Sequence, residues 1–563
     1  MNIEIIAKIA AQLKQSAACL NKNFRFVIPV IICALISLAH AGFDPAIRLD
    51  PQIDRFIQRI EARYGLLPAG YHRQPMGTES FLSYLDSVSQ KPLSASERHE
   101  LSNISKRLSI DNGIYGYYDE EHETGVIINL GLTGESWGRA GKDDKRGGGR
   151  GIISPMLRGH IGKVSFYSGL DVWTEYVYDS LFYQSSWQPY DGNPYTLYGR
   201  GTESANMRAA DFPRAGISYT AGRIDLQAGL DYLRMGPAVH YPVTLSGEAP
   251  PIAYFRTIFD LSHFEYSHFV GFLRSERDKS KYIYSNRLSG NFLGGSLQWG
   301  ISEVMIAGEP TNQQNNDPYN QRRPGMENEK HSWEWVFCIP FVPMVFVEHY
   351  VGDKSNAALS FDASLNWPQN FRFYGEFFID DMLSPWKIFS DDWGNKWAVT
   401  AGVQYFSTLY SRDISAGIEY SRVEPWVYTH FYGGSHRYDH FDISLGSPLG
   451  PNSRAVVING DMNITKKSTI GLSLKSLAKN SQTRGGKITD IFQEERVEYL
   501  IPVENYDSET KRFLGPGTVN HLRPGVYGYY DPSGPFRINA SAEIDVDSDR
   551  GNIHLRLEGG FRF

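Results

Sequence analysis

The stretch Phe536-Arg-Ile-Asn-Ala-Ser-Ala-Glu-Ile-Asp-Val546 alternates strictly between apolar and polar residues. Successive side chains of a β-strand point to opposite faces, so one face of this strand suits lipid and the other suits water. A strand of a soluble sandwich would also alternate, but a second sheet would have to cover its apolar face. We therefore predict an all-β transmembrane protein and keep a soluble sheet as the alternative.

The same period of two continues on both sides of this stretch, in residues 164–173, 397–405, 414–420, 470–474 and 553–563. The last segment ends on Phe563, which resembles the terminal signal that the barrel-assembly machinery reads in outer-membrane proteins. Strand-like segments number roughly sixteen to twenty, and bacterial barrels have even strand numbers, so we expect an antiparallel barrel of about 18 strands. Long outer loops are expected at residues 135–151, 183–212, 308–332 and 478–520.

The composition fits a barrel better than a helical membrane protein. Aromatic residues make up 13% of the chain, yet the mean hydropathy is −0.37. No apolar run after residue 41 approaches the roughly 20 residues of a transmembrane helix. The net charge of −7 argues against a nucleic-acid partner. Cys338 stands alone after residue 41, so no intrachain disulfide is expected.

The N-terminal residues follow the pattern of an export signal. Residues 26–38 are mostly apolar, Lys22 and Arg25 precede them, and Ala39-His-Ala41 gives a small-x-small cleavage pattern. A transmembrane anchor is the alternative, but this stretch rises about 20 Å against a hydrocarbon core of about 30 Å. We predict a signal peptide at residues 1–41, cleaved before Gly42.

Residues 42–110 follow a helical rather than a strand period. Pro51 suits the first position of a helix that Gly65 would stop, and a second helix fits residues 78–88. A third helix would take Ser94 or Ser96 as its cap, with Glu97 in the first turn. We expect a small periplasmic helical domain at residues 42–110, packed against the end of a barrel formed by residues 111–563.

Charged residues on predicted strands form the first candidate site: Arg234, Glu376, Asp380, Asp381, Glu419, Arg422 and Glu424. Carboxylates facing the lumen could accept sugar hydroxyls or pair with arginines. The alternative is an ion-pair network that braces and plugs the barrel. Two carboxylates would also suit a glycosidase, but that chemistry needs a paired spacing that a sequence does not show.

Aromatic residues crowd one predicted outer loop and form the second candidate site: Tyr183, Trp187, Tyr190, Tyr195 and Tyr198. Aromatic faces stack on sugar rings, so this mixture suits saccharide binding, and packing of the loop on itself is the alternative. Arg146 and Arg150 lie in a Gly-rich stretch and could meet an acidic polysaccharide.

A metal site is the weaker interpretation of His430, His436 and His440. Their stretch fits a strand, a loop and a strand, so it lacks the helical spacing that would bring two imidazoles together. We expect neither a metal nor a cofactor.

Several motifs in order resemble the Wzi family of outer-membrane capsule-assembly proteins. They are Gly229-Leu-Asp-Tyr-Leu-Arg-Met-Gly-Pro, Leu245-Ser-Gly-Glu-Ala-Pro-Pro, Tyr374-Gly-Glu-Phe-Phe-Ile-Asp-Asp, Gly417-Ile-Glu-Tyr-Ser-Arg-Val-Glu-Pro-Trp-Val-Tyr-Thr-His and Gly446-Ser-Pro-Leu-Gly-Pro-Asn-Ser. The resemblance implies an eighteen-stranded barrel with a periplasmic helical bundle, acting as a surface lectin that holds capsular polysaccharide. Met235, Ala238 and Val239 depart from the family pattern, and the outer loops show no match.

The function expected from the sequence is therefore a non-enzymatic, lectin-like barrel of the outer membrane that binds and retains capsular or exopolysaccharide. Its other partners would be outer-membrane lipid and the barrel-assembly machinery, and we expect a monomer. A channel or export porin with an acidic lumen is the alternative, and an envelope glycan hydrolase is the third. No Gly-x-Ser-x-Gly motif is present to favour the hydrolase.

Overall fold

The computed structural model describes residues 46–47, 51–108, 114–119, 121, 123–141, 145–177, 207–274, 280–309, 333–351, 355–430, 433–492, 507–533, 536–547 and 551–562. The predicted signal peptide and Phe563 lie outside these residues, so both stay predictions.

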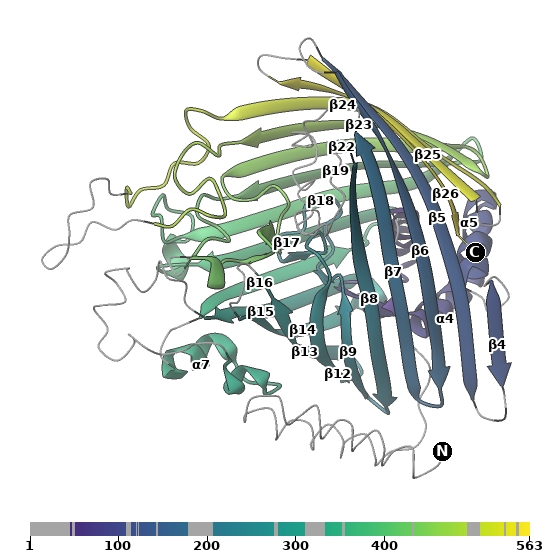
Figure 1. Ribbon diagram of the computed structural model, residues 1–563, viewed down its shortest axis with the longest axis horizontal. Coiled ribbons are helices and arrows are strands. Elements are labelled where there is room, and N and C mark those ends of the chain that lie inside the picture. The colour runs from purple at the N-terminus through teal and green to yellow at the C-terminus, as the bar shows by residue number, and fades with distance from the viewer. Residues whose placement is uncertain are drawn as a thin grey trace, which may run out of the picture. The chain divides into compact units, whose positions relative to one another are not determined.

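An antiparallel sheet of 18 strands closes into a barrel within the described residues, as predicted (Figure 1). The strands are β5 (Thr124–Gly141), β6 (Lys145–Ile161), β7 (Val164–Val177), β8 (Met207–Ala221), β9 (Ile224–Asp231), β12 (Ile252–Asp260), β13 (Phe264–Leu273), β14 (Lys281–Phe292), β15 (Leu297–Gly308), β16 (Asn356–Leu365), β17 (Phe371–Asp381), β18 (Lys396–Leu409), β19 (Arg412–Val423), β22 (Ser453–Thr465), β23 (Ser468–Lys479), β24 (Val519–Ser533), β25 (Phe536–Asp547) and β26 (Gly551–Arg562). The strands predicted from alternation, such as β7 and β25, are confirmed.

The ring closes between its first and last strands. β26 pairs with β5, with Ile553 opposite Ala140 and Arg562 opposite Gly131. A short strand, β4 (Tyr115–Asp119), pairs with the next part of β5 and lies in line with β26. Both edges of β5 are therefore hydrogen-bonded to another strand along most of its length.

The barrel has two unlike ends. At one, which we call the turn end, the strands are joined by short connections such as 222–223, 410–411 and 466–467. At the other, the loop end, the connections are long, among them 232–251, 382–395 and 424–452. None of the described helices is long and apolar enough to cross a membrane.

The prediction of a long outer loop at residues 135–151 is wrong. β5 and β6 run through it, and Arg146 and Arg150 therefore lie in β6 rather than in a loop. β5 has 18 residues. At about 3.3 Å per residue and a tilt of about 45° it rises roughly 40 Å, more than the roughly 25 Å of an apolar band. The part of these strands beyond the apolar band does not need an apolar face toward lipid. Its sequence can therefore be Gly-rich and charged, like that of a loop.

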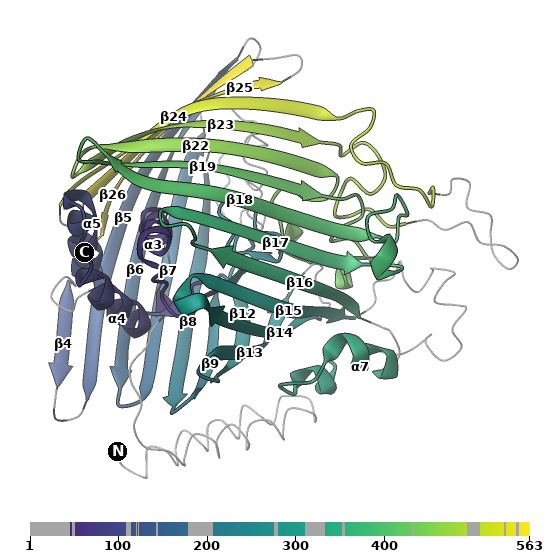
Figure 2. The ribbon, with the colours of Figure 1, turned by 180° about the vertical axis from the view of Figure 1, so that it is seen from behind.

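Three helices gather at one end of the barrel (Figure 2). They are α3 (Pro51–Tyr64), α4 (Thr78–Ser89) and α5 (Ala95–Leu108), which confirms all three predicted helices. Gly65 ends α3 with a φ of 66°. Ser94 caps α5, because its Oγ accepts from the Glu97 amide at 3.1 Å while the Ser94 amide donates to the Glu97 carboxylate at 2.8 Å. Apolar side chains of the three helices, including Phe56, Ile60 and Phe81, form one core.

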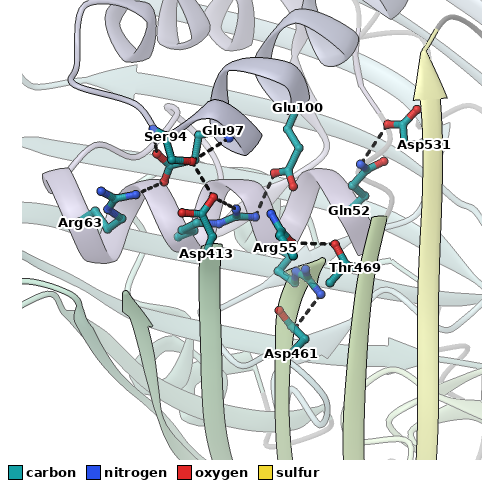
Figure 3. Close-up of polar contacts among 12 residues, drawn as sticks. Gln52, Arg55, Arg63, Ser94, Glu97, Glu100, Asp413, Asp461, Thr469 and Asp531 are labelled. Atoms are coloured by element: carbon teal, nitrogen blue, oxygen red, sulfur yellow. Dashed lines mark hydrogen bonds and ion pairs between the residues drawn. The ribbon is translucent and has the colours of Figure 1, made fainter. Parts of the chain in front are cut away.

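Polar contacts fix the helices to the turn end (Figure 3). Arg55 Nη1 lies 2.7 Å from the carboxylate of Asp461 on β22. Ser94 Oγ donates to Asp413 on β19 at 2.5 Å, and Gln52 donates to Asp531 on β24 at 3.2 Å. α3 also reaches the lumen, where Glu61 accepts from Arg372 of β17 at 2.5 Å. The helical part is thus anchored in the barrel mouth, as expected.

Two connections from the loop end fold into the barrel. We call residues 232–251 the first inner segment, and residues 424–430 with 433–452 the second inner segment. Short strands stabilise them: β10 (Arg234–Met235), β11 (Leu245–Ser246), β20 (Asp439–His440) and β21 (Ile443–Ser444). β10 also pairs with β2 (Arg73–Gln74), which ties the first inner segment to the helical part, while β1 (Ala46–Ile47) pairs with β3 (Met76–Gly77).

The inner segments pack on apolar side chains that face the lumen. Val243 and Leu445 from the segments join Ile283, Ile306 and Phe378 from the wall in one core, and all five are at most 1% exposed. This differs from the expectation of an interior suited only to water. Apolar residues fit there because protein, rather than water, fills this part of the lumen.

A further connection, between β15 and β16, carries the helix α7 (Met344–Val351) and the short helix η6 (Trp335–Cys338). Both views show α7 beside β15 and beyond the wall of the barrel (Figures 1 and 2). Three other short helices, η4 (Leu293–Gly295), η7 (Pro385–Lys387) and η8 (Gly433–Ser435), lie in connections.

Candidate functional site

Two of the predicted luminal carboxylates hold the first inner segment by its backbone. Glu376 of β17 accepts from the amides of Ala238 at 2.9 Å and Val243 at 2.8 Å. Glu419 of β19 accepts from the amides of Val239 at 2.9 Å and Tyr241 at 2.8 Å. Such charge-assisted bonds to backbone N–H groups are strong, so the two carboxylates fix the segment against the wall.

Further donors complete these two sites. The His240 amide lies 3.1 Å from both Glu419 oxygens, and the Tyr374 hydroxyl donates to Glu419 at 2.8 Å. Gly236 has a φ of 97°, and a Cβ there would lie 2.2 Å from Glu376 Oε1. Only glycine therefore allows the first inner segment to pass so close to the carboxylate.

The second inner segment is held in a similar way. Asp380 of β17 accepts from the Tyr428 amide at 2.6 Å. The hydroxyls of Tyr428 and Tyr438 donate to the carbonyls of Val243 and Thr244 at 2.7 Å and 2.8 Å, which joins the two segments. Burial raises the pKa of both phenols well above the ordinary value, so they stay protonated donors.

Asp381, Arg422 and Glu424 lie apart from this brace, whereas Arg234 belongs to the first inner segment and donates to the Ala238 carbonyl at 2.5 Å. Arg234 pairs with Asp54 of α3 at 3.0 Å, and Asp381, with its side chain 52% exposed, lies 3.3 Å from Lys396. Arg422 contacts Glu424 at 2.5 Å, and Lys511 also contacts Glu424, at 3.1 Å. The predicted set therefore falls into three groups: the brace with Arg234, the exposed Asp381, and the pair Arg422–Glu424. Their contacts favour the bracing alternative over open carboxylates. Whether any of them meets a ligand stays a prediction.

A cavity of about 680 Å³ lies in the lumen, between the helical part, the first inner segment and the wall. Small ligands commonly occupy cavities of about 300–1,000 Å³. Its lining comes from α3, the first inner segment and strands far apart in the sequence, including Asp54, Arg55, Gln58, Arg214, Asp231, Tyr232, Arg234, His240, Gln404, Asn459, Ser473, Lys475, Tyr527, Tyr529, Ser541 and Glu543.

The charges of the cavity wall are mostly paired with one another. Arg214 binds Asp231 through two bonds of 2.7 Å and 3.0 Å, and Lys475 lies 2.9 Å from Glu543. Asp54 Oδ1 and Arg234 Nε are buried and have no hydrogen-bond partner among the described residues. A neutral, hydroxyl-rich ligand suits this wall, because it can bond the remaining lone pairs and N–H groups without breaking the ion pairs.

Aromatic and imidazole groups of the cavity wall also suit a neutral, hydroxyl-rich ligand. Tyr527 and Tyr529 share one face of β24, and the Arg55 guanidinium lies 5.3 Å from the Tyr529 ring centre. Burial lowers the pKa of the His240 imidazole, so it is neutral at pH 7 and can both donate and accept a hydrogen bond. Sequence reasoning missed these residues. The repeated Tyr on the polar face of β24 was the available signal.

The second candidate site comprises the loop aromatics and the arginines of β6. Tyr183, Trp187, Tyr190, Tyr195 and Tyr198 lie outside the described residues. Arg150 shares the lumen-facing side of β6 with Arg158, which donates to the Leu108 carbonyl at 2.8 Å. A saccharide role for these residues stays a prediction.

The histidines weighed for a metal site do not gather with acidic ligands. No group of three or more His, Cys, Asp or Glu with suitable geometry occurs in the part of the chain that the structure describes. His440 Nδ1 accepts from the Arg274 amide at 2.9 Å.

Comparison with known proteins identifies the fold. No protein-family model matches the sequence, and no curated protein matches it. Among solved structures, Wzi of Escherichia coli matches with a TM-score of 0.57 over 92% of this chain and 99% of that chain, at 12% identity. This chain has the fold of Wzi. Wzi is described as an outer membrane protein involved in group 1 capsule assembly and as a carbohydrate-binding β-barrel.

The resemblance to the Wzi family that the motifs indicated is thus confirmed at the level of the fold. A second solved structure, OccK2 (OpdF) of Pseudomonas aeruginosa in complex with glucuronate, matches with a TM-score of 0.41 and 8% identity, over 80% of this chain and 99% of that chain. At 12% identity the match to Wzi shows that the two chains share an architecture, but it does not identify a ligand for this chain.

Proposed function

We propose that the protein lies in the outer membrane of a bacterium and binds a surface polysaccharide without cleaving it. The observation that carries the proposal is a barrel whose lumen is filled by two braced segments and retains a polar cavity with tyrosines, in a fold shared with a carbohydrate-binding protein. Stacking on tyrosine and bonding to paired charges are what sugar rings require.

The outward faces of the strands support the membrane location. Phe255, Ile301, Phe361 and Ile458 are each at least 40% exposed on that side of the barrel, where a soluble protein would show polar residues. The terminal Phe563 would direct the chain to the barrel-assembly machinery.

The specific role that we propose for the protein is retention of capsular or exopolysaccharide at the cell surface.

The test is binding of polysaccharide from the source organism to the purified barrel, with a variant that fills the cavity. Ser473 lines the cavity, whereas its neighbour Leu472 is 63% exposed on the outside. Ser473→Trp should weaken binding about tenfold or more, equivalent to about 1.4 kcal/mol, because the indole takes the space of a sugar ring. Leu472→Trp is the matched control and should leave binding unchanged.

A second arm tests the loop aromatics. If Tyr190→Ala and Tyr195→Ala release polymer from cells while Ser473→Trp does not, the loop rather than the cavity holds the ligand. Wild-type protein that binds no polysaccharide in either assay would contradict the proposed function.

The channel alternative rests on the same cavity, which lies in the lumen. A barrel closed by its braced segments should show no steady conductance in planar bilayers, whereas an open porin conducts. The hydrolase alternative has less support, because Glu376 is 1% exposed and each of its oxygens accepts a backbone amide. Turnover of a surface glycan by the wild-type protein would restore it.

A further inference from the structure

Residues 333–351, which we call the outer strap, lie against the outside of the barrel wall. The strap packs on residues that alternation places on the outward face of β13, β14 and β15. Val270, Tyr284 and Met305 are each at most 6% exposed there and form one core with Phe337 and Met344 of the strap. Outward residues that are not part of this core, such as Leu288 and Ile301, are 37% and 40% exposed.

The strap runs far along the wall. Near the loop end, the Trp333 ring lies 5.0 Å from Tyr282, which pairs with Phe272 across the last part of β13. Toward the turn end, Phe341 stacks on Tyr266 with ring centres 4.1 Å apart. Tyr266 is only two residues from the first residue of β13. From Trp333 to Phe341 the strap therefore follows most of the height of the wall, and α7 comes next in the chain.

Polar side chains of the wall bond the backbone of the strap. The Tyr266 hydroxyl accepts from the Phe341 amide at 2.6 Å, Asn286 donates to the Val342 carbonyl at 2.6 Å, and Glu303 accepts from the Met344 amide at 3.1 Å. Near the other end, the Tyr284 hydroxyl accepts from the Glu334 amide at 3.1 Å. These side chains would be costly on a bare lipid-facing wall, and the strap covers them.

The strap needs few further donors. Pro340 and Pro343 have no N–H group, and the amides of Phe337, Ile339 and Val342 donate within the strap. Irregular backbone survives in hydrocarbon only where its polar groups have protein partners. Most of these backbone groups of the strap have protein partners. A loop in water would not need them, because water would bond its backbone.

The opposite side of the strap is apolar and exposed. Trp335, Ile339 and Phe346 are 40%, 55% and 70% exposed, and Phe341 is 56% exposed although its ring also stacks on Tyr266. The sequence from Trp335 to Val347 contains no charged residue. Outward residues of nearby strands, such as Phe255 and Phe361, are apolar and exposed as well.

We propose that the outer strap is a membrane-embedded element whose exposed face binds the acyl chains of the surrounding bilayer. It replaces the strand surface of β13–β15 as the lipid contact on that side of the barrel. The inference rests on the proposed membrane location, and the experiment separates the two.

The test uses nitroxide labels in dioleoylphosphatidylcholine vesicles. Cys338, the single cysteine among the described residues, is first replaced by Ala, and Phe346→Cys is then labelled. Ile301→Cys on β15 is the lipid-facing control, and Tyr410→Cys, in a turn and 91% exposed, is the aqueous control. Collisions with oxygen, which concentrates in lipid, are compared with collisions with a water-soluble nickel chelate.

The label at Phe346 should match Ile301, with the ratio of oxygen to nickel collisions several-fold above that at Tyr410. A ratio equal to that at Tyr410 would overturn the inference, because the strap would then lie in water. Low collision with both reagents would overturn it as well, because a second copy of the chain would cover the strap. If Ile301 itself collides with nickel, the membrane location has failed rather than the strap.

Discussion

Replacing Glu419 by Gln tests whether the luminal carboxylates brace the first inner segment. Glu419 is 2% exposed, and its carboxylate accepts hydrogen bonds from three backbone amides and from the Tyr374 hydroxyl. An amide group in its place turns one oxygen into a donor, which then faces backbone N–H groups that also donate. At least one charge-assisted bond, about 1.5–3 kcal/mol, is lost, and a buried donor is left unpaired at about 1–3 kcal/mol.

The sum is about 3 kcal/mol or more, which corresponds to about a 100-fold change in the opening equilibrium of the segment. Hydrogen exchange of the Val239, His240 and Tyr241 amides measures that equilibrium directly. Glu419→Gln should accelerate their exchange about 100-fold in detergent micelles, while exchange in strand β25 stays unchanged.

Asp381→Asn is the matched control from the same predicted set. Its half-exposed ion pair with Lys396 should contribute no more than about 1 kcal/mol, so exchange should change less than about fivefold. Exchange of the three amides within threefold of wild type in Glu419→Gln would refute the bracing role, whatever the control shows.

Three further results are expected. Ser94→Ala should lower the free energy of unfolding by about 1 kcal/mol, seen as a lower thermal midpoint, because α5 loses its capping box with Glu97; an unchanged midpoint would contradict it. Arg372→Met should destabilise the contact between α3 and the lumen by about 3–5 kcal/mol, since it leaves the buried Glu61 carboxylate without its ion-pair partner and bonded, among the described residues, only to the Ser364 hydroxyl, and proteolysis of α3 would report it. Burial lowers the pKa of His440 to about 3, below its unfolded value of about 6.5, so stability present above pH 6.5 should be lost as the pH falls toward 3. Hydrogen exchange of the second inner segment at pH 7.5 and 4.5 checks this, and His440→Gln should reduce the difference.

Local signals in the sequence predicted the elements well. Alternation from Phe536 predicted β25, and Ser94 or Ser96 ahead of Glu97 predicted the start of α5, because each signal depends only on neighbouring residues. The structure decides for Ser94 as the cap. The stretch around Arg146 was misjudged for a related reason: strands that rise above the apolar band keep their pairing but not their apolar face.

Long-range partners were beyond the sequence. Glu376 was expected to face the lumen, but its partners Ala238 and Val243 lie 138 and 133 residues away in the chain. Whether a luminal carboxylate meets water, ligand or backbone depends on how a distant loop folds, and no local period encodes that. The outer strap was missed similarly, because an apolar stretch in a loop does not reveal which face of the wall it covers.

The pairing of β26 with β5 has a consequence for biogenesis. Until residues 551–562 reach β5, the sheet has two free edges, each with unbonded N–H and C=O groups that would pair with any extended chain nearby. β4 already occupies part of one edge through Tyr115–Asp119. Removing the last strand should therefore yield aggregates rather than a slightly smaller ring. β25 and β5 both run antiparallel to β26, so without it they would have to pair in parallel, which no other strands of this barrel do among the described residues.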